Sequence, residues 1–299
     1  MSNITPGSNE WLDSVFETII DPDRAIIDPH HHLWQRPDGN DYVLENLWRD
    51  TGSGHNIEKT VFVECHAEYR AAGPENLKVL GETEFVTEQA IQSETAAGHE
   101  QNATISGIVG HADLTLGDQV AKILEQHIEI AQGRFKGIRH AGAHAEHPEA
   151  LMIAGRAPKS LYLKPEFQMG VKKLGEMGLS FDTWHYHYQN QEFDTLAKSA
   201  PGTQMILDHF GTPLGVGPYA SQKAEIYSQW KKDIVEIAKN PNVVAKIGGL
   251  AMPDNGFGWH ERSTPPSSDE FVAAQRDYYL HTIDCFGPDR CMFESNFPV

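Results

Sequence analysis

The chain has 299 residues, 39% of them hydrophobic and 22% charged, and its 42 acidic and 24 basic side chains give a formal net charge of −18. This composition is typical of a globular protein, with room for one large α/β domain or two small ones. The acidic balance argues against nucleic acid and anionic membranes as partners, because both attract basic patches. No apolar run approaches the roughly 18 residues that a membrane span needs. With three cysteines and no signal-peptide pattern, we expect a reduced, cytoplasmic protein.

The first 24 residues are polar and are expected to form a lead-in segment, followed by one domain over residues 25–299. Within the lead-in, apolar residues recur at helical spacing between Trp11 and Ile20. This spacing predicts a short helix that packs on the domain.

Eight short apolar or β-branched runs then recur along the chain, and most are followed by a longer helical pattern. Such alternation predicts βαβ units with parallel strands. Eight units over about 275 residues fit a (β/α)8 TIM-type barrel. An open doubly wound sheet is the alternative, but no glycine-rich dinucleotide loop follows the first run, which also argues against a nucleotide cofactor. The runs are Ala25–His32, Thr60–His66, Thr104–Ala112, Phe135–Ala141, Leu179–His185, Gln204–Phe210, Val243–Leu250 and Cys291–Val299.

Two long linkers, Pro37–Lys59 and Met252–Ser268, are rich in turn-forming residues and follow predicted strands. In a barrel they would be strand-to-helix loops at the C-terminal end, where active sites lie. The helical patterns lie at Leu77–Gly98, Gln119–Ala131, Pro165–Met177, Phe193–Ala200, Ala220–Lys239 and Ser268–Cys285.

The strongest local feature is the run of three histidines at the end of the first predicted strand. Alternation along a strand places His30 and His32 on the same face. Two imidazoles there can share a metal ion or one substrate oxygen. His209 similarly follows an apolar run and precedes Gly211 and Pro213, which places it at the rim of the barrel.

Polar groups also close most of the other predicted strands. Because charges at the end of a barrel are costly unless they are paired or used, these groups are expected to converge on one site. Arg139 is the best candidate for holding a substrate carboxylate or hydroxyl with its guanidinium fork, whereas a salt bridge to Glu64 or Asp208 would explain Lys246. The other groups are His66, His111, Asp113, His140, Asp182, His185 and His187.

The motifs together resemble the amidohydrolase-2 family, and within it the branch with sugar-acid lactonases and pyrone-dicarboxylate lactonase. The resemblance covers about residues 24–299 and rests on Asp28-x-His30-x-His32-x-Trp34, Leu207-Asp208-His209-x-Gly211-x-Pro213 and Phe293-x-Ser295-x-x-Pro298, with shorter matches around Glu64, Glu82, Gly107, Asp113 and Arg139. It implies an amidohydrolase-like barrel with its site at the C-terminal ends of the strands. HExxH, Walker A and GxSxG motifs are absent from the sequence.

The resemblance also implies roles for individual residues. His30 and His32 match the pair that binds a divalent metal, zinc or manganese, or the substrate itself in metal-independent lactonases. His209 matches the histidine that polarises the scissile carbonyl or activates water, and completes the metal set if a metal is bound. His187 falls near a further ligand position, and the expected substrate-binding residues are Trp34, Arg139, His140 and His187.

The last strand departs from the family pattern. Relatives usually place an aspartate, as metal ligand and general base, where this chain has Asn296. An amide cannot take a proton from water and is a poor metal ligand. Glu294 lies two residues earlier, on the same face by alternation, and is a candidate for the missing carboxylate. A carboxylate beyond Val299 is the other candidate, since relatives continue past this strand. We therefore include Glu294 and Asn296 with His30, His32 and His209 as catalytic candidates.

The expected activity is hydrolysis of a lactone of a sugar acid or of an acid from aromatic catabolism. A metal-dependent nonoxidative decarboxylase and a non-catalytic barrel that binds a small acid are the alternatives. A small carboxylate or lactone is the expected partner, and the family suggests a homodimer. No helical pattern follows the eighth strand, so one side of the barrel is expected to expose apolar strand surface. Either the chain is shorter than its natural product, or the lead-in helix or a partner subunit covers that side.

Overall fold

Eight short strands form one parallel sheet in the computed structural model, which describes residues 5–299. Each strand pairs with the next one along the chain, from first to last. The segment after the last strand returns to the first, where Asn296 N donates to His30 O at 2.9 Å, so the barrel is nearly closed. The predicted (β/α)8 barrel is confirmed. The strands are β1 (Ile26–His31), β2 (Ile57–Val63), β3 (Thr104–Gly110), β4 (Phe135–Arg139), β5 (Ser180–Thr183), β6 (Met205–Leu207), β7 (Val243–Ile247) and β8 (Cys291–Phe293).

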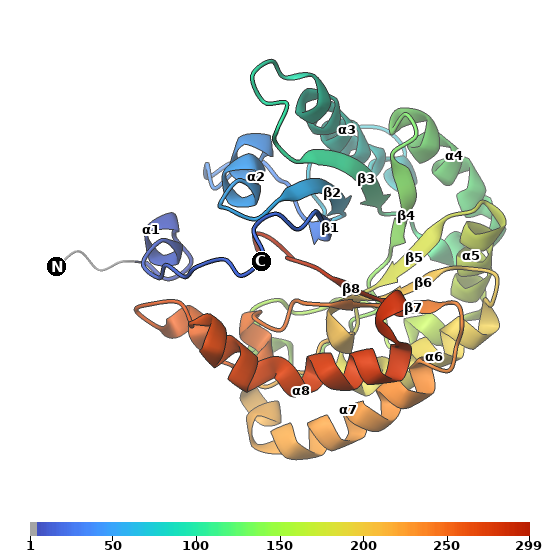
Figure 1. The fold of residues 1–299 in the computed structure, drawn as a ribbon. Helices are drawn as coiled ribbons and strands as arrows, with labels where there is room; N and C mark the ends of the chain where they lie inside the picture. Colours follow the sequence, from blue (N-terminus) through green and yellow to red (C-terminus); the bar gives the residue numbers. More distant parts are fainter. Residues whose placement is uncertain (1–4) are drawn as a thin grey trace.

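Helices lie outside the strands, one between each successive pair (Figure 1). The last of them shows why they begin and end where they do: Ser267 and Glu270 form a reciprocal capping box, and Gly287 with φ 76° ends the helix. The helices are α1 (Asn9–Leu12), which precedes β1, and α2 (Leu44–Thr51), α3 (Leu80–Thr95), α4 (Ala121–Ile130), α5 (Pro165–Glu176), α6 (Asn190–Ser199), α7 (Lys223–Ile237) and α8 (Ser268–Phe286).

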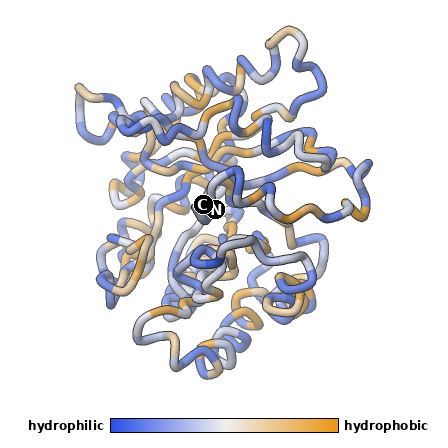
Figure 2. Tube along the Cα trace, turned by 90° about the vertical axis from the view of Figure 1, so that its left-hand side faces the viewer, coloured by the Kyte–Doolittle hydropathy of each residue, from blue (hydrophilic) through white to orange (hydrophobic). Residues whose placement is uncertain are grey.

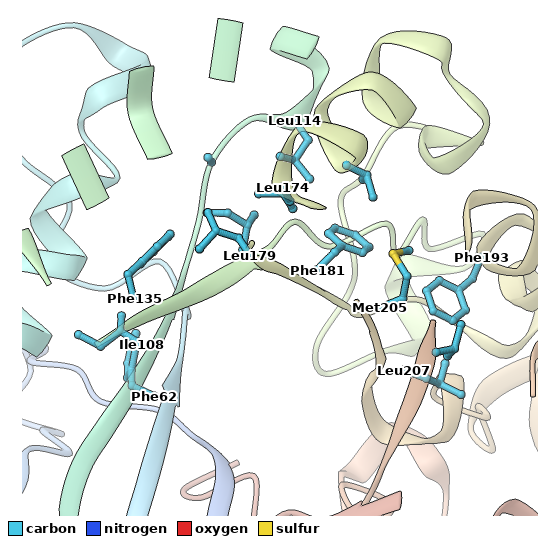
Figure 3. Packing of buried hydrophobic residues seen from close by; sticks show 14 of the residues in the cluster. Phe62, Ile108, Leu114, Phe135, Leu174, Leu179, Phe181, Phe193, Met205 and Leu207 are labelled. Carbon is cyan, nitrogen blue, oxygen red and sulfur yellow. The ribbon is translucent and has the colours of Figure 1, made fainter. Parts of the chain in front are cut away.

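The core lies between the strands and these helices. Figure 3 shows side chains from β2, β3, β5 and β6 together with Leu174 of α5 and Phe193 of α6, all of them fully buried. Burial of such side chains contributes about 1.5–3 kcal/mol each. This packing holds the strands, and therefore the residues that follow them, in fixed positions. The strand residues are Phe62, Ile108, Phe181, Met205 and Leu207.

Hydrophilic and hydrophobic residues alternate along the peripheral segments (Figure 2). This is the pattern of helices with one buried and one solvated face. Among the described helices, none has both the length and the apolar character required to cross a bilayer.

The linker Pro37–Lys59 is not the continuous loop that its turn-forming residues predict, because it contains α2 and the start of β2. The buried side chains of α2 are Leu44, Leu47, Trp48 and Thr51, which follow the i, i+3, i+4, i+7 spacing of a helical face. Trp48 Nε1 also donates to Ala103 O at 2.9 Å. The helical signal was therefore present in the sequence, but surrounding Asp, Asn and Gly residues obscured it.

The helix predicted over Trp11–Ile20 is wrong in its extent, because α1 ends at Leu12. Phe16 and Ile20 are 93% and 99% exposed, so they have no surface on which to bury an apolar face, and a short helix without such burial is not stable. The segment instead carries Glu17 to the start of α8, where its carboxylate accepts from Ser268 N at 3.1 Å. Residues 1–4 of the expected lead-in lie outside the described residues.

Among residues 5–299, no helix follows β8. Apolar strand surface is exposed on this side as expected: Ile27 of β1 is 61% exposed and Phe293 of β8 is 69% exposed.

Candidate active site

Two histidines at the end of β1 lie on the same face, as strand alternation predicts. The ring centroids of His30 and His32 are 5.0 Å apart, and both side chains are buried. Asp28, two residues earlier, accepts from His30 N at 3.2 Å and from Ser295 N at 3.0 Å. Asp28 therefore fixes the segment after β8 against the end of β1, which places Glu294 next to His30.

Glu294 joins the two histidines that come from β1 and from the end of β6. Its Oε2 lies 2.8 Å from His30 Nδ1, and its Oε1 lies 2.7 Å from His209 Nδ1. The candidate ligand atoms of the three side chains lie within 4.8 Å of one another. Two imidazoles and a carboxylate are a donor set that suits a divalent metal such as zinc. The group of His30, His209 and Glu294 is called the histidine–glutamate centre below.

Hydrogen-bond partners define the protonation of this centre. Arg139 Nη1 lies 3.3 Å from His30 Nε2, and Lys246 Nζ lies 3.3 Å from His30 Nδ1. Both of these side chains can only donate, and a neutral imidazole has one acceptor nitrogen, so His30 accepts from one of them at a time. Burial, with the nearby charge of Lys246, holds the pKa of His30 well below its usual value, so this ring is neutral. His209 donates through Nδ1 to Glu294 Oε1, which leaves a lone pair on Nε2 when the ring is neutral.

His32 pairs with Asn296 and not with Glu294. His32 Nδ1 donates to Val63 O at 2.8 Å, and burial lowers the pKa of His32 to about 3, so Nε2 carries a lone pair. Nε2 lies 3.2 Å from Asn296 Oδ1, and two acceptors cannot share a hydrogen bond. We therefore assign the Asn296 amide in the flipped orientation, with Nδ2 donating to His32 Nε2. One further N–H of Asn296 then remains as a donor, which an aspartate at this position would not supply.

Arg139, the last residue of β4, is held by Glu64, which directly follows β2. Arg139 Nε donates to Glu64 Oε1 at 2.8 Å, and Nη2 donates to the Glu64 carbonyl oxygen. Burial alone would raise the pKa of Glu64, but the charge of Arg139 lowers it to about 2. With Nη1 on His30, all three nitrogens of Arg139 have protein partners.

Lys246 of β7 forms a second buried ion group. Its Nζ lies 2.6 Å from Asp182 Oδ2 and 3.3 Å from Asp208 Oδ1, so the salt bridge to Asp208, one of the two expected, is present. Burial raises the pKa of Asp208 to about 7, although Lys246 opposes the shift. Lys246 Nζ is also 3.3 Å from His30 Nδ1. His30 therefore lies among two cations, Arg139 and Lys246, and two carboxylates, Asp208 and Glu294.

Two glycines after β7 leave room for the centre. A Cβ on Gly248 would overlap the Glu294 side chain, and a Cβ on Gly249, whose φ is 76°, would overlap His209 Nδ1. We expect Gly249→Ala to lower kcat/KM about 100-fold, because displacing a catalytic group by about 1 Å has an effect of this size. The matched control is Gly178→Ala, which has φ 72° but open space around it. Equal kcat/KM for the two variants would contradict the prediction.

Other expected site residues lie outside the histidine–glutamate centre. His140 Nδ1 accepts from Leu114 N at 3.2 Å, and His187 Nδ1 accepts from Leu214 N at 3.2 Å. Trp34 donates to Asn40 O at 2.9 Å within its own loop. Among the described residues, these three form no hydrogen bond or ion pair with the centre.

Sequence reasoning assigned no site role to Gly248, Gly249 or Glu82. Glu82 of α3 is buried, and its Oε1 accepts from Cys65 N at 2.9 Å and from Ala67 N at 2.8 Å. It therefore holds the loop that follows β2, next to Glu64. The available signals were a charged residue on the buried face of a helix and a glycine pair directly after a strand.

The sequence that forms this site matches a known protein family. A family model described as Amidohydrolase matches residues 27–299, which is nearly the whole barrel. The chain belongs to the amidohydrolase family. The resemblance noted from the sequence motifs is thus confirmed, and membership supports a hydrolase.

Individual relatives agree with this assignment. The chain is 31% identical over 294 residues to "Uncharacterized protein y4mH" of Sinorhizobium fredii, covering 93% of this chain and 86% of that protein. It is 25% identical over 276 residues to the L-fucono-1,5-lactonase of Burkholderia multivorans, covering 91% and 82%. Among solved structures, a zinc-bound amidohydrolase of Burkholderia multivorans has the same fold, with a TM-score of 0.63, 20% identity and coverage of 91% and 84%.

Proposed function

We propose that this amidohydrolase opens a lactone by adding water to its carbonyl group. The observation that carries the proposal is the contact of one buried carboxylate, Glu294, with the Nδ1 atoms of both His30 and His209 at the C-terminal end of the barrel. This arrangement fixes the tautomer of His209 and directs a basic Nε2 away from the carboxylate. The similarity to a lactonase supports the ester substrate.

In the proposed reaction, His209 Nε2 takes a proton from water while the water oxygen attacks the lactone carbonyl carbon. The carbonyl π electrons move to its oxygen, and the free N–H of Asn296 donates to this oxyanion. The oxyanion then re-forms the carbonyl, the ring C–O bond breaks, and His209 returns its proton to the departing ring oxygen. The products are a carboxylic acid, which releases its proton to solvent at neutral pH, and an alcohol in one open chain. Glu294 stabilises the imidazolium between the two proton transfers.

His30, His209 and Glu294 are also the residues that would hold a divalent metal, either zinc or manganese. A bound metal would supply Lewis-acid polarisation of the carbonyl, as an alternative to the role of His209 as base. The bound zinc of a structural neighbour supports this proposal. The pairing of His32 with Asn296 removes His32 from the metal set expected from the sequence, so the proposed ligands include Glu294 in its place.

A panel of lactones tests the function directly. Purified protein is assayed at neutral pH by acid release, with and without a chelator, against neutral sugar lactones and carboxylate-bearing lactones. We expect ring opening of at least one lactone and loss of that activity in His209→Gln. No ring opening, or equal rates for the variant and the wild type, would overturn the proposal.

The remaining sequence-based expectations stay predictions. They are the boundary between a lead-in of residues 1–24 and the barrel, a homodimer, and a cytoplasmic location. Turnover on any lactone would exclude the non-catalytic alternative. A nonoxidative decarboxylase would instead release carbon dioxide from a carboxylic acid, and no contact in the described residues favours that chemistry over hydrolysis.

A further inference from the structure

Three histidines that the proposed reaction does not use lie together beyond Arg139. His66, His111 and His140 follow β2, β3 and β4, and the ring centroid of His111 lies 5.4 Å from that of His66 and 4.9 Å from that of His140. Glu64 borders the same group, because its Oε2 lies 3.7 Å from His66 Nε2. Since Arg139 contacts both Glu64 and His30, this histidine cluster is one side chain away from the histidine–glutamate centre.

The backbone partners of the cluster determine what its free atoms offer. His111 Nδ1 donates to Arg139 O at 3.0 Å, which leaves Nε2 as an acceptor in the neutral ring. His140 Nδ1 accepts from a backbone N–H, which leaves Nε2–H as a donor. Glu64 is 2% exposed, and its Oε2 has no hydrogen-bond partner in the described part of the chain. The cluster therefore presents one donor and two acceptors.

The buried Arg and Lys side chains next to the cluster are already paired with carboxylates. Arg139 and Lys246 are the only buried basic side chains among residues 5–299, and both are paired with carboxylates. Burial lowers the pKa of His140 to about 3 and also lowers the pKa of His111, so these two rings add no charge. In this proposal Arg139 is paired with Glu64 and is not assigned to a substrate anion. A substrate carboxylate at this position would lie next to the Glu64 carboxylate, a like charge, and would meet no unpaired buried Arg or Lys among residues 5–299.

We propose that His66, His111, His140 and Glu64 form a hydroxyl-binding subsite that selects a neutral polyhydroxylated lactone over one that carries a carboxylate. Hydroxyl groups match the subsite because each can donate to Glu64 Oε2 or His111 Nε2 and accept from His140 Nε2–H. The proposal rests on the proposed lactone hydrolysis, of which it names the substrate class. The side chains of the cluster do not form a metal-binding group, since the three-residue group that the described chain brings within ligand distance is His30, His209 and Glu294.

Binding of two inert analogues tests the subsite without turnover. The probes are a hexono-1,5-lactam and the corresponding hexaro-1,5-lactam, in which a carboxylate replaces the terminal CH2OH group. Calorimetric titration at neutral pH is expected to show at least about tenfold tighter binding of the neutral lactam. Equal binding, or tighter binding of the carboxylate, would overturn the proposal.

Two variants and a control assign the effect to the cluster. His111→Leu removes an acceptor and should weaken binding of the neutral lactam about tenfold, whereas His66→Arg adds a cation at an exposed position and should improve binding of the carboxylate relative to the neutral lactam. His99→Ala is the control, because His99 precedes β3 at the opposite end of the barrel. An unchanged ratio in His66→Arg, which should fold normally, together with unchanged affinity in His111→Leu, would contradict the subsite.

The two proposals can fail separately. If no lactone is opened but the binding contrast and its loss in the variants hold, the subsite stands and the hydrolase proposal fails. If lactones are opened but the carboxylate-bearing ones are bound and turned over equally well, only the subsite fails.

Discussion

Glu294→Gln is expected to lower kcat/KM for lactone opening by about 10³-fold while the protein remains folded. The Glu294 carboxylate accepts from His209 Nδ1–H at 2.7 Å, and its other oxygen lies 2.8 Å from His30 Nδ1. Glutamine has one acceptor oxygen, so its NH2 group must replace one of these two oxygens. When the NH2 group faces His209, the ring carries its proton on Nε2 and cannot act as the base. In either orientation the negative charge that stabilises the His209 imidazolium is lost. Steady-state kinetics on the lactone identified in the panel measures the loss.

Glu236→Gln provides the control for this substitution. Glu236 is exposed on α7 and pairs with Lys239, so the same chemical change there should leave kcat/KM unaltered. Thermal unfolding of both variants checks that the fold is retained. A loss of less than tenfold in Glu294→Gln would show that the carboxylate does not orient the base.

Lys246→Met is expected to reduce the free energy of unfolding by about 3–5 kcal/mol, because removing one partner leaves buried charge uncompensated. Asp182 and Asp208 would remain in the barrel without the ammonium group that contacts both. Urea unfolding of the variant and the wild type measures the difference. Lys239→Met, which breaks only an exposed pair with Glu236, should cause no measurable change.

The loss of stability caused by Lys246→Met should also depend on pH. Burial already raises the pKa of Asp208 to about 7 in the folded protein, and removal of Lys246 raises it further. A folded-state pKa above the unfolded value means that the folded state binds more protons, so stability falls as pH rises toward that pKa. The destabilisation by Lys246→Met should therefore be larger at pH 8 than at pH 5.5. Equal losses at the two pH values would argue against a buried ion group.

Much of the fold could be predicted because each barrel strand is a short apolar run with its own turn signals. The runs ending near His32, His66 and His209 gave the correct strands, with ends one to three residues too long, because the exact end of an element is the least predictable part of it. The α2 helix was missed because about two turns of amphipathic spacing are weak evidence for a helix when loop-forming residues surround them. The lead-in helix was wrong because periodicity does not reveal whether a surface is available to bury it.

The members of the site were predictable, but their pairing was not. Strand position and motif resemblance identified His30, His209 and Glu294 as candidates. Which imidazole nitrogen donates, and that His32 faces Asn296, depend on contacts between barrel strands that are neighbours in space but far apart in the sequence. The commitment of Arg139 to Glu64 is of the same kind, since 75 residues separate them in the chain.

If Glu294 and His209 act as one unit in lactone hydrolysis, a double-mutant cycle will show it most directly. The measurement is kcat/KM for the wild type, Glu294→Gln, His209→Gln and the double variant on one lactone. We predict that the double variant loses about as much as the worse single variant, because residues that act together are not additive. A double variant whose loss equals the product of the two single losses would contradict it.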